Sequence, residues 1–236
     1  MNLAALAVAA ALLVPGGMRP AVQGRILDAV VEAYGGEAAL RRLEAFRVEA
    51  DVDSKMQGAT GKARRDYQSP DRLRVEIVYP SAKEVRVLDG ERGWRGDAGA
   101  LARVQGAPRL SMVYQLLRST VPESLVRHRD RLEDRGTRAQ GETEYRVIGL
   151  PWSAELDLSF LVDVKTHRVV WVEGSIHAGP MQTTFATRYD DFRTVEGVLY
   201  PFLEQNYASG QHTGSTRVRA VVFAPKDLGP FDPTRL

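Results

Sequence analysis

Two histidines that stand near serines are the first residues in this sequence that could do chemistry. His177 lies in the stretch GSIHAG and His212 in the stretch SGQHTGS. A serine near a histidine could form a nucleophile–base pair, but no G-x-S-x-G turn is present to expose the hydroxyl. The histidines also lack the H-E-x-x-H spacing of a zinc site. The sequence therefore shows no pattern for nucleophilic or metal-assisted catalysis.

Two groups of acidic residues are candidates for acid–base chemistry. Asp190 and Asp191 are adjacent, but Arg188 and Arg193 flank them, which favours surface ion pairs. The acidic residues of 49–53 alternate with apolar ones, which places them on the wet face of a strand. No glycine-rich phosphate loop opens a helix. We therefore expect the protein not to be an enzyme, and we expect neither a cofactor nor a metal site.

The composition is that of an ordinary globular protein. Of the 236 residues, 44% are hydrophobic and 26% charged, and the formal net charge of +2 does not suggest a nucleic-acid partner. The chain has no cysteine. This excludes a disulfide framework, a thiolate metal site, a cysteine nucleophile and a lipid-modified N-terminal cysteine.

The N-terminus predicts an export signal. Leu3–Val14 is an uninterrupted apolar run, too short to span a membrane and followed by Pro-Gly-Gly. No lysine or arginine precedes the run, and no small-x-small site follows it, so a buried N-terminal helix is the alternative. We expect residues 1–24 to be a signal peptide, cut between Gly17 and Gly24. Residues 25–236 would then form one exported, periplasmic domain without a lipid anchor.

The apolar spacing beyond this segment predicts a few helices. Ile26, Leu27, Val30, Val31 and Tyr34 fall on one helical stripe, which Gly-Gly ends. A second helical pattern lies in the middle of the chain and begins near a proline. The expected helices are Arg25–Tyr34, Glu37–Leu43, Pro108–Arg118 and Pro122–His128.

Most of the chain has the two-residue period of half-buried strands. Phe46, Val48, Ala50 and Val52 alternate with charged residues, and the same pattern recurs before and after the helical insert. We predict eleven or twelve strands in one α+β domain, a large curved antiparallel sheet with helices against its inner face. The expected strands are residues 46–53, 62–68, 72–79, 83–88, 93–96, 131–137, 144–150, 155–163, 168–177, 182–192, 199–207 and 215–223.

Four stretches resemble the LolA/LolB-like superfamily of outer-membrane lipoprotein carriers and receptors, in its lipoprotein-sorting branch. In order they are YQSPDRLRVEIVYP, VRVLDGERGW, FLVDVKTHRVVWVE and YDDFRTVEGVLYPFLEQ, and the likeness covers about Ile26 to Phe223. The resemblance implies an incomplete (half) β-barrel of about 11 strands, covered by the N-terminal helix and the helical insert. It also implies a hydrophobic cavity that takes acyl chains.

Two departures from the family pattern bear on the cargo. The carrier has an arginine before the proline of the third-strand motif, where it helps to hold a lid shut, and this chain has Ser69 there. The latch is therefore missing or is replaced, with Arg72 or Arg74 as candidates. The receptor has an acylated cysteine, which this chain lacks. Both departures argue against the transfer of lipoproteins, but they are compatible with a general role as a lipid carrier.

Trp94 follows an Asp-Gly turn, where it would either pack on a helix or cover the mouth of the cavity, and both can hold. Trp171 is expected in the core rather than in the pocket. Leu116 and Leu117 are expected on a movable lid. The residues predicted to line the cavity are Phe46, Val48, Leu73, Val75, Ile77, Val87, Trp94, Leu116, Leu117, Leu156, Leu158, Phe160 and Phe185.

The sequence thus predicts a non-catalytic, monomeric periplasmic carrier, which moves a lipid or lipoprotein acyl chain toward the outer membrane. Its expected partners are the lipid and transport proteins of the inner and outer membranes. Two alternatives remain: a periplasmic sensor or interaction module with the same fold, and an accessory protein of a lipid transporter.

Overall fold

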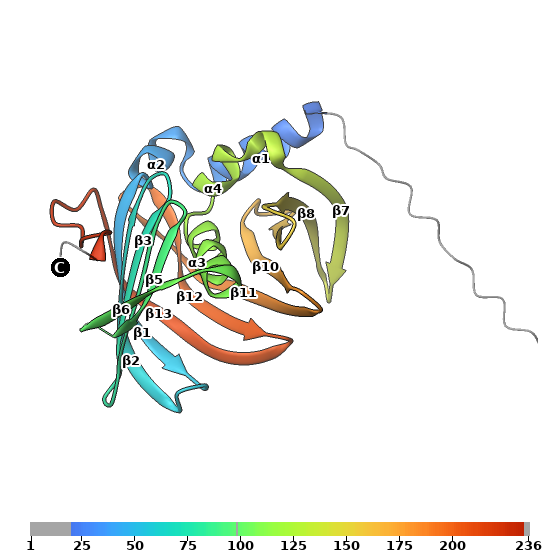
Figure 1. The fold of residues 1–236 in the computed structure, drawn as a ribbon. Coiled ribbons are helices and arrows are strands. Elements are labelled where there is room, and N and C mark those ends of the chain that lie inside the picture. The colour runs from blue at the N-terminus through green and yellow to red at the C-terminus, as the bar shows by residue number, and fades with distance from the viewer. Residues whose placement is uncertain (1–19, 98, 234–236) are drawn as a thin grey trace, which may run out of the picture.

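Among the residues that the structure describes, thirteen strands form one antiparallel sheet that curves without closing (Figure 1). The computed structural model describes residues 20–97 and 99–233. The sheet order is β6-β5-β4-β3-β2-β1-β13-β12-β11-β10-β9-β8-β7, so β6 and β7 are its edges. The strands are β1 (Ala45–Ser54), β2 (Ala59–Gln68), β3 (Arg72–Val78), β4 (Lys83–Asp89), β5 (Arg92–Asp97), β6 (Ala100–Val104), β7 (Glu133–Gln140), β8 (Thr143–Pro151), β9 (Leu156–Asp163), β10 (Val169–Ala178), β11 (Met181–Val195), β12 (Val198–Ala208) and β13 (Gln211–Phe223).

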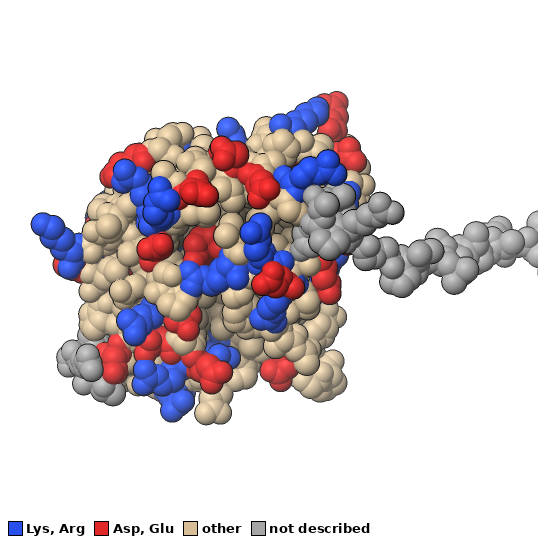
Figure 2. All heavy atoms as spheres, turned by 90° about the horizontal axis from the view of Figure 1, so that it is seen from above, with Lys and Arg blue, Asp and Glu red and all other residues tan. Residues whose placement is uncertain are grey.

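The helices occupy two places. α3 lies inside the curve of the sheet, whereas α1, α2 and α4 lie together at one end of it (Figure 1). Seen from that end (Figure 2), acidic and basic side chains are interspersed, as on an ordinary solvated surface. No helix among the described residues is long and apolar enough to cross a membrane. The helices are α1 (Pro20–Ala33), α2 (Gly36–Arg42), α3 (Gly106–Ser119), α4 (Glu123–Arg127) and the 3-10 helix η1 (Arg129–Arg131).

The sheet consists of two meanders, β1–β6 and β7–β13, which the helical insert separates in the chain. Pairing of β1 with β13 joins them, with Phe46 opposite Phe223 and Asp53 opposite Ser215. The last strand therefore lies beside the first, and both meanders contribute side chains to one concave face.

The inner face of the sheet and α3 share the main apolar core. Leu110, Val113 and Leu117 of α3 are buried in it. Tyr114 donates a hydrogen bond of 2.9 Å to the backbone carbonyl of Val172. Beside it, a Cβ at Gly174 would lie 2.6 Å from Cδ2 of Tyr114, so only glycine lets α3 sit this close to β10.

A second, smaller cluster lies on the outer face, under the C-terminal segment after β13. Val85 and Val87 of β4 pack there with Phe231, and Trp94 packs against the three. The prediction that Val87 and Trp94 line the cavity, and that Trp94 packs on a helix, is therefore wrong. Successive residues of a strand point to opposite faces of the sheet. Gly93 faces Met112 of α3, so its neighbour Trp94, and Val87 opposite it on β4, point to the outer face.

The predicted elements are otherwise close to the observed ones. The expected helices and all twelve expected strands are present, with ends that differ by a few residues. The exception is β6, a short edge strand that the sequence did not predict. It has no fully buried residue, and its two partly buried ones, Leu101 and Val104, do not alternate. The apolar run Leu3–Val14 lies outside the described residues, so the export signal and its cleavage site stay predictions.

Candidate ligand-binding site

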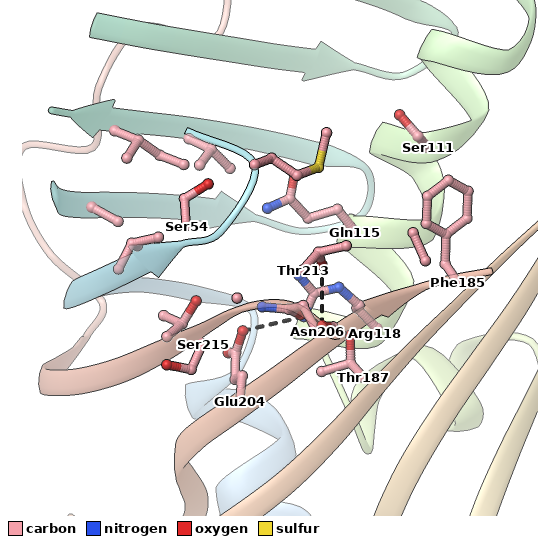
Figure 3. Close-up of a pocket in the computed structure, with 18 of the residues that line it drawn as sticks. Ser54, Ser111, Gln115, Arg118, Phe185, Thr187, Glu204, Asn206, Thr213 and Ser215 are labelled. Atoms are coloured by element: carbon pink, nitrogen blue, oxygen red, sulfur yellow. Dashed lines mark hydrogen bonds and ion pairs between the residues drawn. The ribbon is translucent and has the colours of Figure 1, made fainter. Parts of the chain in front are cut away.

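A cavity of about 390 Å³ lies between α3 and the concave face of the sheet. Strands β1–β3 and β11–β13 form its walls together with one side of α3 (Figure 3). Its volume is within the range of about 300–1,000 Å³ that is usual for small-molecule sites. The interior of the half-barrel is thus not filled by the protein's own side chains. The apolar part of the lining includes Val52, Val75, Ile77, Met112 and Phe185.

Regular periodicity positions the polar part of the lining. On α3, Ser111, Gln115 and Arg118 are separated by four and three residues, so they lie on one face of the helix. On β12, Glu204 and Asn206 have the same parity and both line the cavity. Helix and strand therefore present polar groups to one another across the cavity.

Glu204 and Arg118 form a buried ionic cluster with Arg65 of β2, which also lines the cavity. We call this the Arg–Glu–Arg cluster (Arg65, Glu204 and Arg118). Arg65 donates through Nη2 to Oε1 of Glu204 at 2.8 Å. Arg118 donates through Nη1 to Oε2 of Glu204 at 3.1 Å, and Figure 3 labels both of these residues. The side chains of Arg65, Glu204 and Arg118 are 6%, 2% and 10% exposed. Arg65 also donates to Oγ of Ser119 at 2.8 Å. The cluster has two positive charges and one negative charge.

The two arginines keep the carboxylate of Glu204 ionised. Burial alone would raise the pKa of Glu204, but Arg65 and Arg118 outweigh it and hold the pKa below its usual value. Both guanidiniums stay protonated because the pKa of arginine is far above neutral. The cluster is therefore a fixed set of charges rather than a proton-transfer pair.

The rim of the cavity carries further charges and is open to solvent. Arg86 and Arg95 line it, and both donate to Oε1 of Glu84, with N–O distances of 2.9 and 2.8 Å. The pKa of Glu84 is lowered, since its ion pairs with these arginines outweigh the effect of burial. Met56, at the tip of the β1–β2 hairpin, also lines the cavity and is 81% exposed.

A second cavity, of about 330 Å³, lies on the other side of α3 beneath α4 and η1. Trp152 forms part of its wall, with the His128 ring at 4.9 Å in an edge-on arrangement and the Arg131 guanidinium at 5.2 Å from its centre. The pKa of His128 is lowered by burial and by the neighbouring Arg131 and Arg127. No group of three or more metal-binding side chains occurs among the residues that the structure describes.

Solved structures with the same arrangement of strands and helices are found by comparison of folds. An outer membrane lipoprotein-sorting protein domain from Vibrio parahaemolyticus matches with a TM-score of 0.55 and 8% identity, over 92% of this chain and 98% of that one. A LolA superfamily protein from Nitrosomonas europaea matches with a TM-score of 0.54 and 11% identity, over 88% and 97%. This chain has the LolA-like fold.

A third structure, a DUF1329 family protein from Desulfovibrio piger, matches with a TM-score of 0.53 and 9% identity, over 86% of this chain and 95% of that one. No protein-family model matches the sequence, and no curated protein matches it. The likeness therefore lies in the LolA-like fold, which does not by itself specify the chemistry of the site.

In this LolA-like fold, α4 is tied to the turn between β2 and β3 by a hydrogen bond. Arg127 of α4 donates through Nη2 to Oγ of Ser69 at 2.6 Å and forms an ion pair with Glu123 on its own helix. The two candidates for a replacement latch do not take part. Arg72 pairs with Asp89, and Arg74 pairs with Glu76 and donates to the carbonyl of Pro230, so the prediction that either replaces the latch is wrong.

Ser69→Ala tests this tie. We expect the variant to lose about 0.5–1.5 kcal/mol of unfolding free energy, the usual net contribution of a hydrogen bond, and to speed hydrogen exchange at the amides of α4. Urea denaturation and exchange mass spectrometry measure the two effects. Ser81→Ala, in the exposed β3–β4 turn, is the control and should change neither. Equal exchange at α4 in the two variants would contradict the tie.

The predicted lining residues fall into four groups in the LolA-like fold. Val75, Ile77 and Phe185 line the larger cavity, and Leu116 and Leu117 line the second cavity. Val87 and Trp94 lie on the outer face, as described above. The others are buried in the core and line neither cavity: Phe46, Val48, Leu73, Leu156, Leu158 and Phe160.

The Arg–Glu–Arg cluster was not predicted from the sequence, because charged residues are usually exposed. A signal for two of its members was nevertheless present. Glu204 has the parity of the buried Tyr200 and Phe202 on β12, and Arg65 has that of the buried Tyr67 on β2. A charged residue on the apolar parity of a strand indicates a buried ionic group.

The other chemical candidates lie apart from the cavity floor. Arg188 and Arg193 form ion pairs with Asp190 and Asp191 at 3.6 and 2.6 Å, which confirms the expected surface pairs. Trp171, expected in the core, packs against a small outer-face cluster that contains Leu161.

Proposed function

We propose that this protein is a non-catalytic carrier that holds an amphiphilic lipid between α3 and the concave face of the sheet. The observation that carries the proposal is the partly empty cavity of about 390 Å³, in which an apolar wall meets a charged floor. A ligand that fits both surfaces has a hydrocarbon part and a polar part. An acyl-chain lipid is the simplest molecule of this kind.

The hydrocarbon part supplies most of the binding free energy. Each methylene removed from water contributes about 0.8 kcal/mol, so a sixteen-carbon chain gains on the order of 12 kcal/mol gross if fully buried. Lost translational and rotational freedom cancels at least about 4 kcal/mol of this gain. The remainder can support binding in a preformed cavity. The ligand would enter and leave through the rim, which is open to solvent.

The polar groups of the cavity support binding rather than catalysis. Polar residues that converge on a cavity could signal an active site, and the Arg–Glu–Arg cluster does converge there. However, Glu204 accepts from two guanidiniums and has a lowered pKa, so it is a weak base and is not protonated at neutral pH. The arginines cannot serve as bases either. The cluster is suited to holding charge in place.

The setting of the carrier follows from the same proposal. A signal peptide over residues 1–24 would export the chain, and the cargo would cross the periplasm toward the outer membrane. Transport proteins of the two membranes would load and unload it. The two structures with the LolA-like fold that are named for lipoprotein sorting and for the LolA superfamily support this setting.

Lipid extraction and native mass spectrometry of the protein purified from its own host test the proposal. We expect one lipid per chain, and a rise in melting temperature when sixteen-carbon amphiphiles are added to delipidated protein. Ala63→Leu, which adds a larger side chain to the cavity wall, should weaken binding by about tenfold or more. Ala220→Leu, on the outward parity of β13, is the matched control. A lipid-free protein that no amphiphile stabilises would contradict the proposal.

A further inference from the structure

The guanidinium of Arg118 has more N–H donors than its neighbours in the described part of the chain accept from. Its side chain is only 10% exposed and lines the cavity. Its Nη1 donates to Glu204, the guanidinium lies over the Tyr114 ring at 5.8 Å, and it also interacts with the Tyr189 hydroxyl. Of the five N–H donors of Arg118, those not used by these neighbours are left for another acceptor. A guanidinium edge with two N–H donors matches the two oxygens of a carboxylate or phosphate.

The charge of the Arg–Glu–Arg cluster is also unbalanced. Both oxygens of Glu204 are taken, one by Arg65 and one by Arg118, so one positive charge is not neutralised. The neighbouring groups on β11 do not supply a counter-charge: the Tyr189 hydroxyl donates to the backbone carbonyl of Arg118, and Thr187 donates to Asn206. A buried charge that lacks a partner is costly, so the site favours an anion.

We propose that Arg118 binds the oxyanion headgroup, a carboxylate or a phosphate, of a free amphiphile that enters the cavity head first. This inference rests on the proposed function and specifies its ligand. The headgroup meets the remaining N–H donors of Arg118 at the floor, and the hydrocarbon tail runs along Ile77 and Phe185 toward the rim.

The gradient of exposure along the cavity sets this orientation. The cluster at the floor is at most 10% exposed, whereas Met56 at the rim is 81% exposed and the Arg95 side chain 53%. A headgroup at Arg118 is thus enclosed by protein. A lipid whose polar end is a whole polypeptide cannot place that end there, so the ligand is a free anionic amphiphile rather than an acylated protein.

A set of ligands with one chain length separates this inference from the proposed function. Calorimetry would compare palmitate and hexadecyl phosphate with hexadecanol, and with acetate and inorganic phosphate alone. We expect the two anionic amphiphiles to bind about tenfold or more tightly than the alcohol, and the small anions to bind far more weakly. Equal affinities for palmitate and hexadecanol would overturn the headgroup site and leave the carrier intact. If palmitate, hexadecyl phosphate and hexadecanol all fail to bind, both the headgroup site and the carrier function are overturned. If inorganic phosphate binds as tightly as hexadecyl phosphate, the ligand is a small anion and not an amphiphile.

Variants of Arg118 test the residue itself. Arg118→Gln leaves Arg65 and Glu204 as a neutral pair and should abolish the preference for palmitate over hexadecanol, while Arg118→Lys should restore part of it. Arg92→Gln is the matched control, because Arg92 lies on the same strand as Arg95 but stacks on Trp94 at the outer face. An unchanged preference in a folded Arg118→Gln protein would overturn the assignment.

A measurement on the unmodified protein covers the case in which Arg118→Gln does not fold. Palmitate labelled with ¹³C at the carboxyl or at the terminal methyl group would be bound and exposed to a soluble paramagnetic chelate. We expect stronger broadening at the methyl end, and a lower pKa for the bound carboxyl than for the free acid. Stronger broadening at the carboxyl end would overturn the head-first orientation.

Discussion

Glu204→Gln is expected to lower the free energy of unfolding by about 3–5 kcal/mol, because it leaves two buried guanidiniums without a counter-charge. The Glu204 side chain is 2% exposed and accepts hydrogen bonds from both Arg65 and Arg118. A glutamine can accept from one of them but brings no charge. Urea denaturation at neutral pH measures the loss. The control is Glu49→Gln, an exposed residue 4.0 Å from Arg219, for which we expect a change within about 0.5 kcal/mol.

The pH dependence of stability provides a second test of the same residue. The pKa of Glu204 is lower in the folded protein than its usual value, so its stabilising contribution is complete above the unfolded value of about 4.3. It is lost as the pH falls through the folded pKa, where the carboxylate takes up a proton. Glu204→Gln should lack this part of the acid-induced loss. If the variant and the original protein lose the same stability between pH 5 and the acid transition, Glu204 is not held ionised by the cluster.

Asp66→Asn is expected to cost about 3 kcal/mol or more and to release the C-terminal segment from the outer face. The side chain of Asp66 is 1% exposed and accepts from Arg47 at 2.7 Å and from Arg64 at 2.9 Å. It also accepts from the backbone amide of Gly229 at 2.8 Å, and so ties that segment to β2. Burial would raise the pKa of Asp66, but these three partners hold it below its usual value.

Two measurements follow the Asp66 variant. Denaturation gives the loss of unfolding free energy, and exchange mass spectrometry should show faster exchange over residues 227–231. Asp51→Asn is the control, since Asp51 lies on the exposed face of β1, 3.5 Å from Arg219. Slow exchange at residues 227–231 in a destabilised Asp66→Asn protein would show that Phe231, and not the aspartate, holds the segment down.

The small apolar cluster on the outer face explains why the predicted position of Val87 was wrong. Val87 lies in an alternating stretch of the kind that core strands have, and the sequence alone assigned it, with Trp94, to the cavity. The covering group is Phe231, almost 150 residues further along the chain. The two-residue period of a strand shows that one of its faces is apolar. It does not show whether that face lies on the concave or on the outer side of the sheet.

Local sequence determined the elements of this protein because their periods are set by residues close together in the chain. The apolar stripe of α1, the alternation in β1, β3 and β9, and the insert between two meanders could all be predicted. The four motifs in order indicated the LolA-like fold for the same reason, since each marks a turn or strand of the meanders.

Only the tertiary structure decided where the polar floor of the cavity lies. Arg65, Arg118 and Glu204 come from β2, α3 and β12, and the last is 139 positions from the first. Each is an ordinary charged residue in its own segment, and nothing local says that they meet. Their ionic cluster exists because the pairing of β1 with β13 brings the two meanders together around α3. A contact between residues so far apart in the chain depends on the tertiary fold and has no signal in any single stretch of sequence.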